Sequence, residues 1–324
     1  MTHAIRITQH GGPEVLQWAG VQVADPAPGE LRVRHTAVGL NFIDVYHRSG
    51  LYPLKLPSGL GTEAAGVVEA VGAGVDEFKP GDRVAYAGGP LGACAEARCL
   101  PAEAAIRLPR DIGDRDAAAL MLKGLTSHYL LRRTFPVKRG DVLLVHAAAG
   151  GVGSVLVPWA KHLGATVIGT AGSADKRALA RQLGCDHVLP YLGGAFAAEV
   201  RRLTAGRGVD VVYDSVGKDT FLESLECLRP LGTMVSFGNS SGKPPAIVPN
   251  VLAEKGSLFL TRPTLFHYTA RREDLLSAAK ALFHVMRAGV VKARIGQTFA
   301  LKDAANAHAD LEARKTTGST VLLP

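Results

Sequence analysis

The sequence has 324 residues, of which 47% are hydrophobic, and a formal net charge of +8 that gives a sequence pI near 9.4. This length allows about two domains. No apolar run approaches the roughly 20 residues that cross a bilayer, and the N-terminus lacks the apolar core of a signal peptide. The cations are dispersed, in pairs such as Arg132-Arg133 and Arg201-Arg202, which is typical of a solvated surface. We therefore expect a cytoplasmic protein that associates with neither membranes nor nucleic acids.

The four cysteines are too few and too irregularly spaced for a disulfide framework. Cys94 and Cys99 are too far apart for a C-x-x-C pair, no histidine cluster accompanies them, and Cys185 and Cys227 stand alone. This usage suits a reducing compartment and predicts no metal site.

The first third of the chain is rich in short strand patterns separated by Gly and Pro turns. Alternating or buried-type runs occupy residues 4–7, 31–38, 66–72 and 82–86. Short strands with frequent turns predict a partly open β-barrel.

From about Leu120 the pattern changes to helices that alternate with buried strands. This alternation predicts a doubly wound parallel sheet, and therefore an α/β fold class. After it come a helical stretch over residues 271–288 and a last strand over 320–323. The strands expected in the parallel sheet are residues 142–145, 165–170, 209–214, 232–237 and 258–261.

A glycine turn joins the first of these strands to a helix. Ala148, Gly150 and Gly153 occupy the three glycine positions of the dinucleotide fingerprint, so the first position departs from it. Such a turn brings backbone N–H groups at a helix N-terminus close to a diphosphate. Pro158 falls inside the following helix, where it removes a hydrogen bond and predicts a local kink.

The end of the second strand indicates which dinucleotide binds. An NAD site usually carries an acidic residue there to bind the ribose 2′-hydroxyl. Here Thr170 is followed by Ala171-Gly172-Ser173 and then by Lys176-Arg177, whose cations suit a 2′-phosphate. The sequence therefore predicts NADPH as the cofactor.

Several motifs along the chain resemble one family. Residues 41–53, 61–66, 146–153, 211–217 and 235–242 are similar to the corresponding segments of bacterial NADPH:quinone oxidoreductases, the zeta-crystallin-like branch of the medium-chain dehydrogenase/reductase superfamily. The resemblance runs along essentially the whole chain. It implies a GroES-like partly open β-barrel domain plus a Rossmann doubly wound parallel sheet domain. The implied limits are residues 1–122 and 263–324 for the first domain, and 123–262 for the Rossmann domain.

The resemblance also implies that the branch is free of zinc. Its zinc-dependent relatives place a histidine ligand before the glutamate of the motif that here reads Gly61-Thr62-Glu63. A threonine cannot replace an imidazole ligand, and we expect Glu63 to be a buried carboxylate with a structural partner. Such enzymes are usually homodimers joined through their Rossmann domains.

The site residues implied by the resemblance fall into two groups. Asn41 and Tyr46 face the nicotinamide and the substrate, and are the catalytic candidates. The cofactor-binding residues are Asn41, Tyr46, Lys123, Thr126, Gly150, Gly151, Val152, Gly172, Ser173, Lys176, Tyr191, Phe237, Gly238, Asn239, Ser240 and Arg262.

The predicted reaction is hydride transfer from NADPH to a quinone, which needs close approach and a donor near the developing oxyanion, but no metal. Tyr46 is the candidate donor, and Asn41 is expected to orient the nicotinamide. One alternative is reduction of activated alkenes such as 2-alkenals; another is a non-enzymatic role as an NADPH- or RNA-binding protein. The physiological quinone, the one- or two-electron course, the oligomer size and the proton donor stay open.

Overall fold

The computed structural model describes residues 2–191 and 195–324, and the chain divides into two compact units. The terminal unit contains residues up to Leu125, Arg271–Phe283 and Lys292–Pro324. The central unit contains Thr126–Ala270 and His284–Val291. The domain limits expected after residues 122 and 262 stay a prediction. Among the helices in the described part of the chain, none combines the length and apolar character needed for a transmembrane span.

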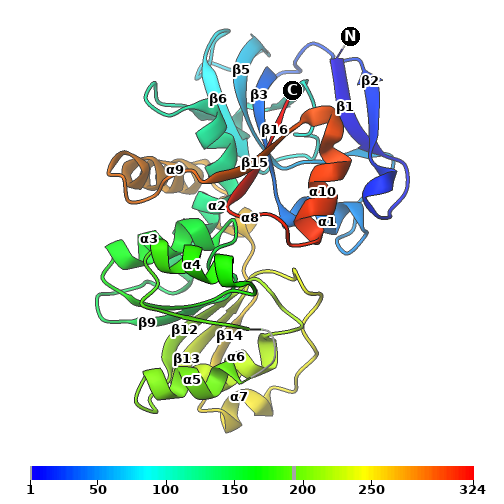
Figure 1. The fold of residues 1–324 in the computed structure, drawn as a ribbon. Helices are drawn as coiled ribbons and strands as arrows, with labels where there is room; N and C mark the ends of the chain where they lie inside the picture. Colours follow the sequence, from blue (N-terminus) through cyan, green and yellow to red (C-terminus); the bar gives the residue numbers. More distant parts are fainter. Residues whose placement is uncertain (1, 192–194) are drawn as a thin grey trace. The chain divides into compact units, whose positions relative to one another are not determined.

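The terminal unit is built on a seven-stranded sheet and a smaller three-stranded sheet (Figure 1). The larger sheet follows the order β15-β16-β3-β5-β6-β8, and β7 also pairs with β3; the smaller sheet has the order β2-β1-β4. Most neighbouring strands are antiparallel, whereas β15 and β16 pair in parallel. The strands are β1 (Thr2–Ile7), β2 (Gln17–Val21), β3 (Glu30–Leu40), β4 (Ser58–Gly59), β5 (Glu63–Val71), β6 (Arg83–Ala87), β7 (Ala97–Pro101), β8 (Ile106–Arg107), β15 (Ile295–Ala300) and β16 (Ser319–Leu323).

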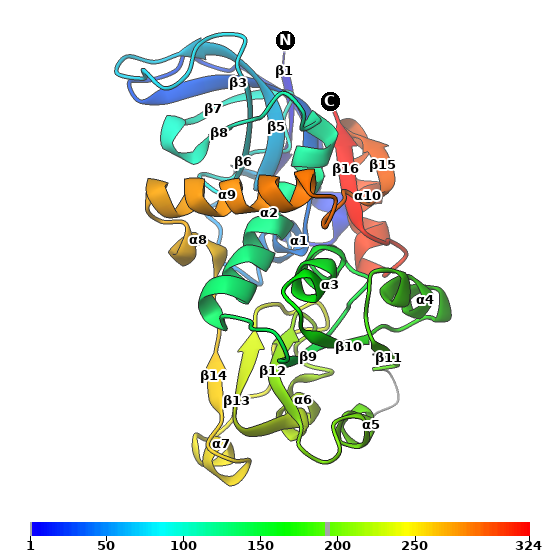
Figure 2. The same ribbon diagram turned by 90° about the vertical axis from the view of Figure 1, so that its left-hand side faces the viewer.

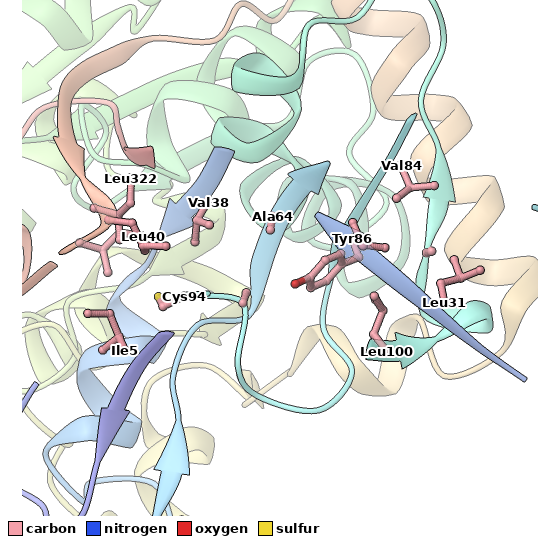
Figure 3. Close-up of a cluster of buried hydrophobic side chains, with 14 of the residues drawn as sticks. Ile5, Leu31, Val38, Leu40, Ala64, Val84, Tyr86, Cys94, Leu100 and Leu322 are labelled. Carbon is pink, nitrogen blue, oxygen red and sulfur yellow. The ribbon is translucent and has the colours of Figure 1, made fainter. Parts of the chain in front are cut away.

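Apolar side chains from these strands meet in one core. Figure 3 shows Leu31, Val38 and Leu40 of β3 with Ala64 of β5 and Tyr86 of β6, all of them buried. Inward residues on a strand are spaced by two, which explains the alternation seen in the sequence, and the register shift between His35 and Ala37 carries β3 from inward Leu31 to inward Val38. The two ends of the chain contribute to the same core through Ile5 of β1 and Leu322 of β16.

The helices of the terminal unit lie between or after its strands. Two of them contain the points at which the chain passes from one unit to the other, namely α2 and α9. The helical segments are η1 (Pro13–Val15), α1 (Phe42–Arg48), η2 (Ala102–Ala104), α2 (Asp114–Tyr129), α9 (Arg272–Arg287), η4 (Leu301–Asp303) and α10 (Ala304–Glu312).

The central unit is a six-stranded parallel sheet of order β11-β10-β9-β12-β13-β14, which Figure 2 shows from β14 on the left to β11 on the right. The chain starts at β9 in the middle of the sheet and moves first to one edge and then to the other. This order confirms the predicted doubly wound sheet, whose switch point lies between β9 and β12. The strands are β9 (Val142–Val145), β10 (Thr166–Thr170), β11 (His187–Leu189), β12 (Val209–Asp214), β13 (Leu228–Ser236) and β14 (Phe259–Thr261).

Helices cover both faces of this sheet. In Figure 1, α3 and α4 lie on one face, and α5 and α6 lie on the other. The helix α3 is continuous through Pro158, and the expected kink stays a prediction. The helical segments are the π-type turn η3 (Leu130–Thr134), α3 (Gly153–His162), α4 (Ala174–Gln182), α5 (Phe196–Leu203), α6 (Phe221–Cys227), α7 (Asn250–Glu254) and α8 (Leu265–Tyr268).

A buried arginine ties α1 to α10 in the terminal unit. Arg48 is only 1% exposed, and its Nη2 donates to both carboxylate oxygens of Glu312 at 2.8 and 2.7 Å. Its Nη1 lies 3.1 Å from Nδ1 of His308, and its Nε donates to the Gly11 carbonyl at 3.2 Å. Burial, together with the arginine charge, lowers the pKa of His308 to about 3, so this imidazole stays neutral and accepts a hydrogen bond. The helix that carries Tyr46 is thereby fixed to the C-terminal part of the chain.

Glu312→Ala should lower the free energy of unfolding by about 2 kcal/mol, because it leaves a buried cation without its carboxylate partner. The matched control is Asp310→Ala on the same helix, whose carboxylate pairs with Lys315 at 3.6 Å on the surface. That change should cost less than about 0.5 kcal/mol. Urea unfolding of both variants is the measurement, and equal losses would contradict the assigned role of Arg48.

Candidate functional site

The glycine turn lies at the carboxyl end of β9, in the middle of the parallel sheet. His146 N donates to the Tyr213 carbonyl and Ala148 N to the Thr170 carbonyl, each at 3.0 Å, so the turn is bonded to both neighbouring strands. A Cβ atom on Gly153 would overlap the Ala147 carbonyl oxygen and lie 2.6 Å from that of Ala148. The third fingerprint position therefore needs glycine so that α3 can begin directly against the turn.

The alanine at the first fingerprint position has a compensation on the next strand. Ala148 is fully buried, and a Cβ atom on Gly169 of β10 would lie 2.8 Å from the Cβ of Ala148. Because Gly169 has no side chain, the extra methyl group of Ala148 fits between β9 and β10. The departure from the fingerprint thus leaves the turn intact.

The turn presents backbone donors to a bound anion. Within the described residues, the N–H groups of Gly151 and Val152 donate to no backbone carbonyl. Val152 is the N-cap of α3, so the positive end of the helix dipole faces the turn. No side chain caps this helix N-terminus. These donors, and the space that glycine leaves, fit the diphosphate of a dinucleotide.

The loop after β10 suits a 2′-phosphate. Ser173 is the N-cap of α4, and its Oγ accepts a hydrogen bond from Lys176 N at 3.2 Å. Arg177 Nη1 donates to the Gly172 carbonyl at 3.2 Å, which ties this cation to the loop. No carboxylate lies between Thr170 and Ser173 to compete with a phosphate group. Tyr191 follows β11 and is half-buried.

A third loop of the central unit follows β13. Arg262 Nη1 donates to the Ser236 carbonyl at 2.7 Å, and its Nη2 donates to the Asn239 amide oxygen at 3.1 Å. A Cβ atom on Gly238 would lie 2.8 Å from Cα of Ser215, so this loop also approaches its neighbour through a glycine. The structure thus brings Phe237–Ser240 and Arg262 together beside the carboxyl end of β13.

The terminal unit contains a buried polar constellation around Glu63, which is 0% exposed. Its Oε2 accepts hydrogen bonds from Asn41 Nδ2 at 2.8 Å and from Lys123 Nζ at 3.3 Å. Its Oε1 accepts from Leu122 N at 2.6 Å. A Cβ atom on Gly39 would lie 2.8 Å from Cδ of Glu63, so this neighbour must be glycine. Glu63 thus holds two predicted site residues, Asn41 and Lys123, by one carboxylate oxygen.

A second buried carboxylate supports the same constellation. Asp44 is 0% exposed, and its Oδ2 accepts from Asn41 N at 2.9 Å while its Oδ1 accepts from Thr62 Oγ1 at 3.4 Å. Burial, with a smaller contribution from the charge of Glu63, raises the pKa of Asp44 to about 7. Asp44 is therefore mostly protonated and uncharged below neutral pH. Under those conditions it adds no second negative charge beside the Lys123–Glu63 ion pair.

Tyr46 lies on α1, which begins directly after Asn41. It is 8% exposed, and its ring packs edge-on against that of Tyr52 with centroids 5.2 Å apart. Tyr52 N donates to the Tyr46 carbonyl at 3.0 Å, so the loop after α1 folds back onto the helix. Thr126, on the part of α2 that belongs to the central unit, is 6% exposed.

Comparison with known proteins identifies the class. The family model described as "Alcohol dehydrogenase GroES-like domain" matches residues 27–110, and the model described as "Zinc-binding dehydrogenase" matches residues 151–282. Together they define the chain as a medium-chain dehydrogenase/reductase, and they confirm the predicted GroES-like and Rossmann architecture.

Close relatives cover the whole chain. The quinone oxidoreductase of Pseudomonas aeruginosa is 52% identical over 100% of both chains. The structure of Escherichia coli quinone oxidoreductase complexed with NADPH has a TM-score of 0.98 at 49% identity and covers 100% of each chain. The 2-haloacrylate reductase of a Burkholderia species is 49% identical, over 100% of this chain and 99% of its own. The chain therefore belongs to the quinone oxidoreductase family, as its motifs predicted.

The name of one family model implies zinc, but the residues present do not fit a zinc site. Among the described residues, no group of three or more His, Cys, Asp or Glu side chains is placed to hold a metal ion. Thr62 stands at the position of the expected histidine ligand, and both oxygens of Glu63 already accept hydrogen bonds from protein donors. The residues around Glu63 therefore do not form a zinc site.

Asp44→Asn should remove one pH-dependent contribution to stability. The raised pKa means that the folded protein binds a proton more tightly than the unfolded chain, so wild-type stability falls as pH rises from about 4 to about 7. Asparagine can still accept from Asn41 N but carries no charge. The stability of Asp44→Asn relative to wild type should therefore increase by a few kcal/mol over this range and then level off.

Urea unfolding of both proteins at a series of pH values is the measurement. Asp25→Asn, which changes a carboxylate that is 94% exposed, is the control and should show no such trend. A relative stability of Asp44→Asn that is independent of pH would contradict the shifted titration of Asp44.

Proposed function

We propose that this protein is an NADPH-dependent quinone reductase that works without a metal. The observation that carries the proposal is the buried constellation of Asn41, Glu63 and Lys123, in which the carboxylate accepts hydrogen bonds from an amide and an ammonium. Thr62, beside this carboxylate, stands at the position of the histidine ligand in metal-dependent relatives. The chain surrounding it is 49% identical, over its whole length, to a quinone oxidoreductase whose structure contains NADPH.

The central unit supplies the proposed nucleotide site. Gly150, Gly151 and Val152 would bind the diphosphate through backbone N–H groups and the N-terminus of α3. The 2′-phosphate and adenosine would lie at the loop after β10. The residues proposed for this region are Gly172, Ser173, Lys176 and Tyr191. The residues proposed to close the nucleotide site are Phe237, Gly238, Asn239, Ser240 and Arg262, and Thr126 is proposed to lie near the nicotinamide end.

The terminal unit supplies the proposed reaction site. Bound NADPH supplies the hydride. Glu63 fixes the rotation of the Asn41 amide, which orients the nicotinamide, and Lys123 places an ammonium beside it. Tyr46 donates a hydrogen bond to the quinone oxygen on which negative charge develops, because a phenol stays protonated at neutral pH. The resulting hydroquinone anion takes its proton from water.

Reduction of activated alkenes is a second candidate function. Its support is the 49% identity to a protein named 2-haloacrylate reductase, which spans the whole chain. Reduction of an enone and reduction of a quinone both develop negative charge on an oxygen atom, so the same donor serves both. The two functions therefore differ in the shape of the acceptor and must be separated by direct comparison.

We also propose a homodimer joined through the central units. β14 is an edge strand of the parallel sheet, and its Phe259 and Leu260 are 61% and 38% exposed. An uncovered edge strand with apolar side chains favours pairing with a second strand, and a second copy of this chain supplies one. Sedimentation velocity of the wild-type protein tests this proposal, and a monomer at micromolar concentration would exclude it.

The chelator-treated wild-type protein should oxidise NADPH rapidly with 1,4-benzoquinone and slowly with a 2-alkenal. Tyr46→Phe should lower kcat with the quinone about tenfold, because it removes one donor to the developing oxyanion. Steady-state absorbance of NADPH is the measurement. Tyr86→Phe is the control, since its hydroxyl bonds to His35 in the core of the terminal unit. Faster turnover with the alkenal would favour the second candidate function.

Lys176→Ala should raise the KM for NADPH roughly tenfold to a hundredfold and leave the KM for NADH nearly unchanged, because only NADPH carries the 2′-phosphate. Arg181→Ala removes an equal charge from the last turn of the same helix and should affect both cofactors equally. Initial rates at varied concentrations of each cofactor decide the outcome. Equal effects of Lys176→Ala on both cofactors would remove this residue from the 2′-phosphate site.

A further inference from the structure

His146 joins the ends of three neighbouring strands in the central unit. It follows β9 directly and is 1% exposed. Its Nδ1 lies 2.9 Å from Oγ1 of Thr170, the last residue of β10, and its Nε2 lies 2.8 Å from Oγ of Ser224 on α6. Two further hydrogen bonds connect Ser224 to Asp214, the last residue of β12. Ser224 Oγ donates to the Thr220 carbonyl at 2.7 Å, and Thr220 Oγ1 donates to the Asp214 carboxylate.

The directions of these hydrogen bonds follow from the number of protons available. A serine hydroxyl has one proton, and Ser224 gives it to the Thr220 carbonyl. Ser224 Oγ must therefore accept from Nε2–H of His146, which leaves Nδ1 without a proton. Nδ1 then accepts from the Thr170 hydroxyl. Burial lowers the pKa of His146, so the neutral ring that this arrangement requires is the stable one.

The chain of hydrogen bonds lies between two loops that the proposed function assigns to the cofactor. His146 precedes the glycine turn with its diphosphate donors, and Thr170 precedes the loop of Ser173 and Lys176. The diphosphate and the 2′-phosphate of NADPH are attached to the same ribose, so the two loops that hold these groups must keep a precise relative position, to within a fraction of an ångström. A ring that is bonded at both nitrogens between the strand ends limits their relative movement.

We propose that His146 is a positioning residue for NADPH, held in the Nε2–H form by Ser224 so that Thr170 can fix the 2′-phosphate loop against the diphosphate turn. This inference rests on the proposed NADPH binding by the central unit. Its distinctive consequence is that Thr170 and Ser224, which the imidazole of His146 joins, act on cofactor binding as one unit.

A double-mutant cycle on the Kd for NADPH tests the proposal. Thr170→Val and Ser224→Ala should each raise the Kd about fivefold to tenfold, and the double variant should raise it no further than the larger single change. In a His146→Phe background, which keeps a ring against Phe196, neither change should have a further effect. If the His146→Phe variant fails to fold, the Kd values of the two single variants and of their double variant still test whether Thr170 and Ser224 act as one unit.

The control is Thr204→Val in the same unit. Its hydroxyl donates to the Val200 carbonyl at 2.8 Å and accepts from Gly208 N at 2.9 Å, before the amino end of β12 and thus away from the proposed site. The Thr204→Val change should lower the free energy of unfolding and leave the Kd for NADPH unchanged. Independent, additive effects of Thr170→Val and Ser224→Ala, or an unchanged Kd in both, would overturn the proposal.

Nitrogen-15 spectra of the cofactor-free protein supply a second readout. Wild type should show the His146 signals of the Nε2–H form, and Ser224→Ala should shift them towards the other tautomer. Unchanged signals in Ser224→Ala would overturn the role of Ser224. Absence of NADPH binding by wild type, with the Nε2–H signals present, would instead reject the proposed function and leave the hydrogen-bond chain as a structural feature.

Discussion

The constraint on which the proposed reaction site depends is the burial of the Glu63 carboxylate. An ionised carboxylate without water is costly unless each oxygen has a partner, and here Leu122 N satisfies one oxygen while Asn41 and Lys123 satisfy the other. These donors come from the start of α1 and from α2. The carboxylate on β5 thus joins three elements. Because leaving Glu63 unpaired would cost free energy, its hydrogen bonds hold in place the side chains that are proposed to meet the nicotinamide.

The central unit depends on a different constraint, which is close backbone approach. A side chain on Gly153 would collide with the carbonyls of its own turn, a side chain on Gly238 would collide with Ser215, and Gly169 makes room for the methyl group of Ala148. Each of these glycines lies at or near the carboxyl end of a parallel strand, where open α/β sheets bind ligands. The proposed nucleotide site is therefore built mainly from backbone, whereas the proposed reaction site is built from buried side chains.

This difference decides how much was predictable from the sequence. The parallel strands and the glycine turn have local signals, namely apolar runs and fixed glycine spacing, and the structure and the relatives confirm them. The use of Lys176 at a 2′-phosphate was also inferred locally, and stays a proposal. The supporting contacts had no such signal, because His146 and Ser224 are 78 residues apart and Arg48 and Glu312 are 264 apart. Residues so far apart in the sequence belong to no common helical or strand repeat, so these pairs become visible only in the folded structure.

The most direct test of the central claim is a single-turnover measurement of hydride transfer. Chelator-treated wild type and Glu63→Gln are each loaded with NADPH and mixed rapidly with 1,4-benzoquinone, and the loss of NADPH absorbance is followed. If the buried carboxylate positions Asn41 and Lys123 for a metal-free reaction, wild type retains its full rate after chelation and Glu63→Gln is at least about tenfold slower. Loss of the wild-type rate on chelation, or an unchanged rate in a folded Glu63→Gln variant, would contradict this account.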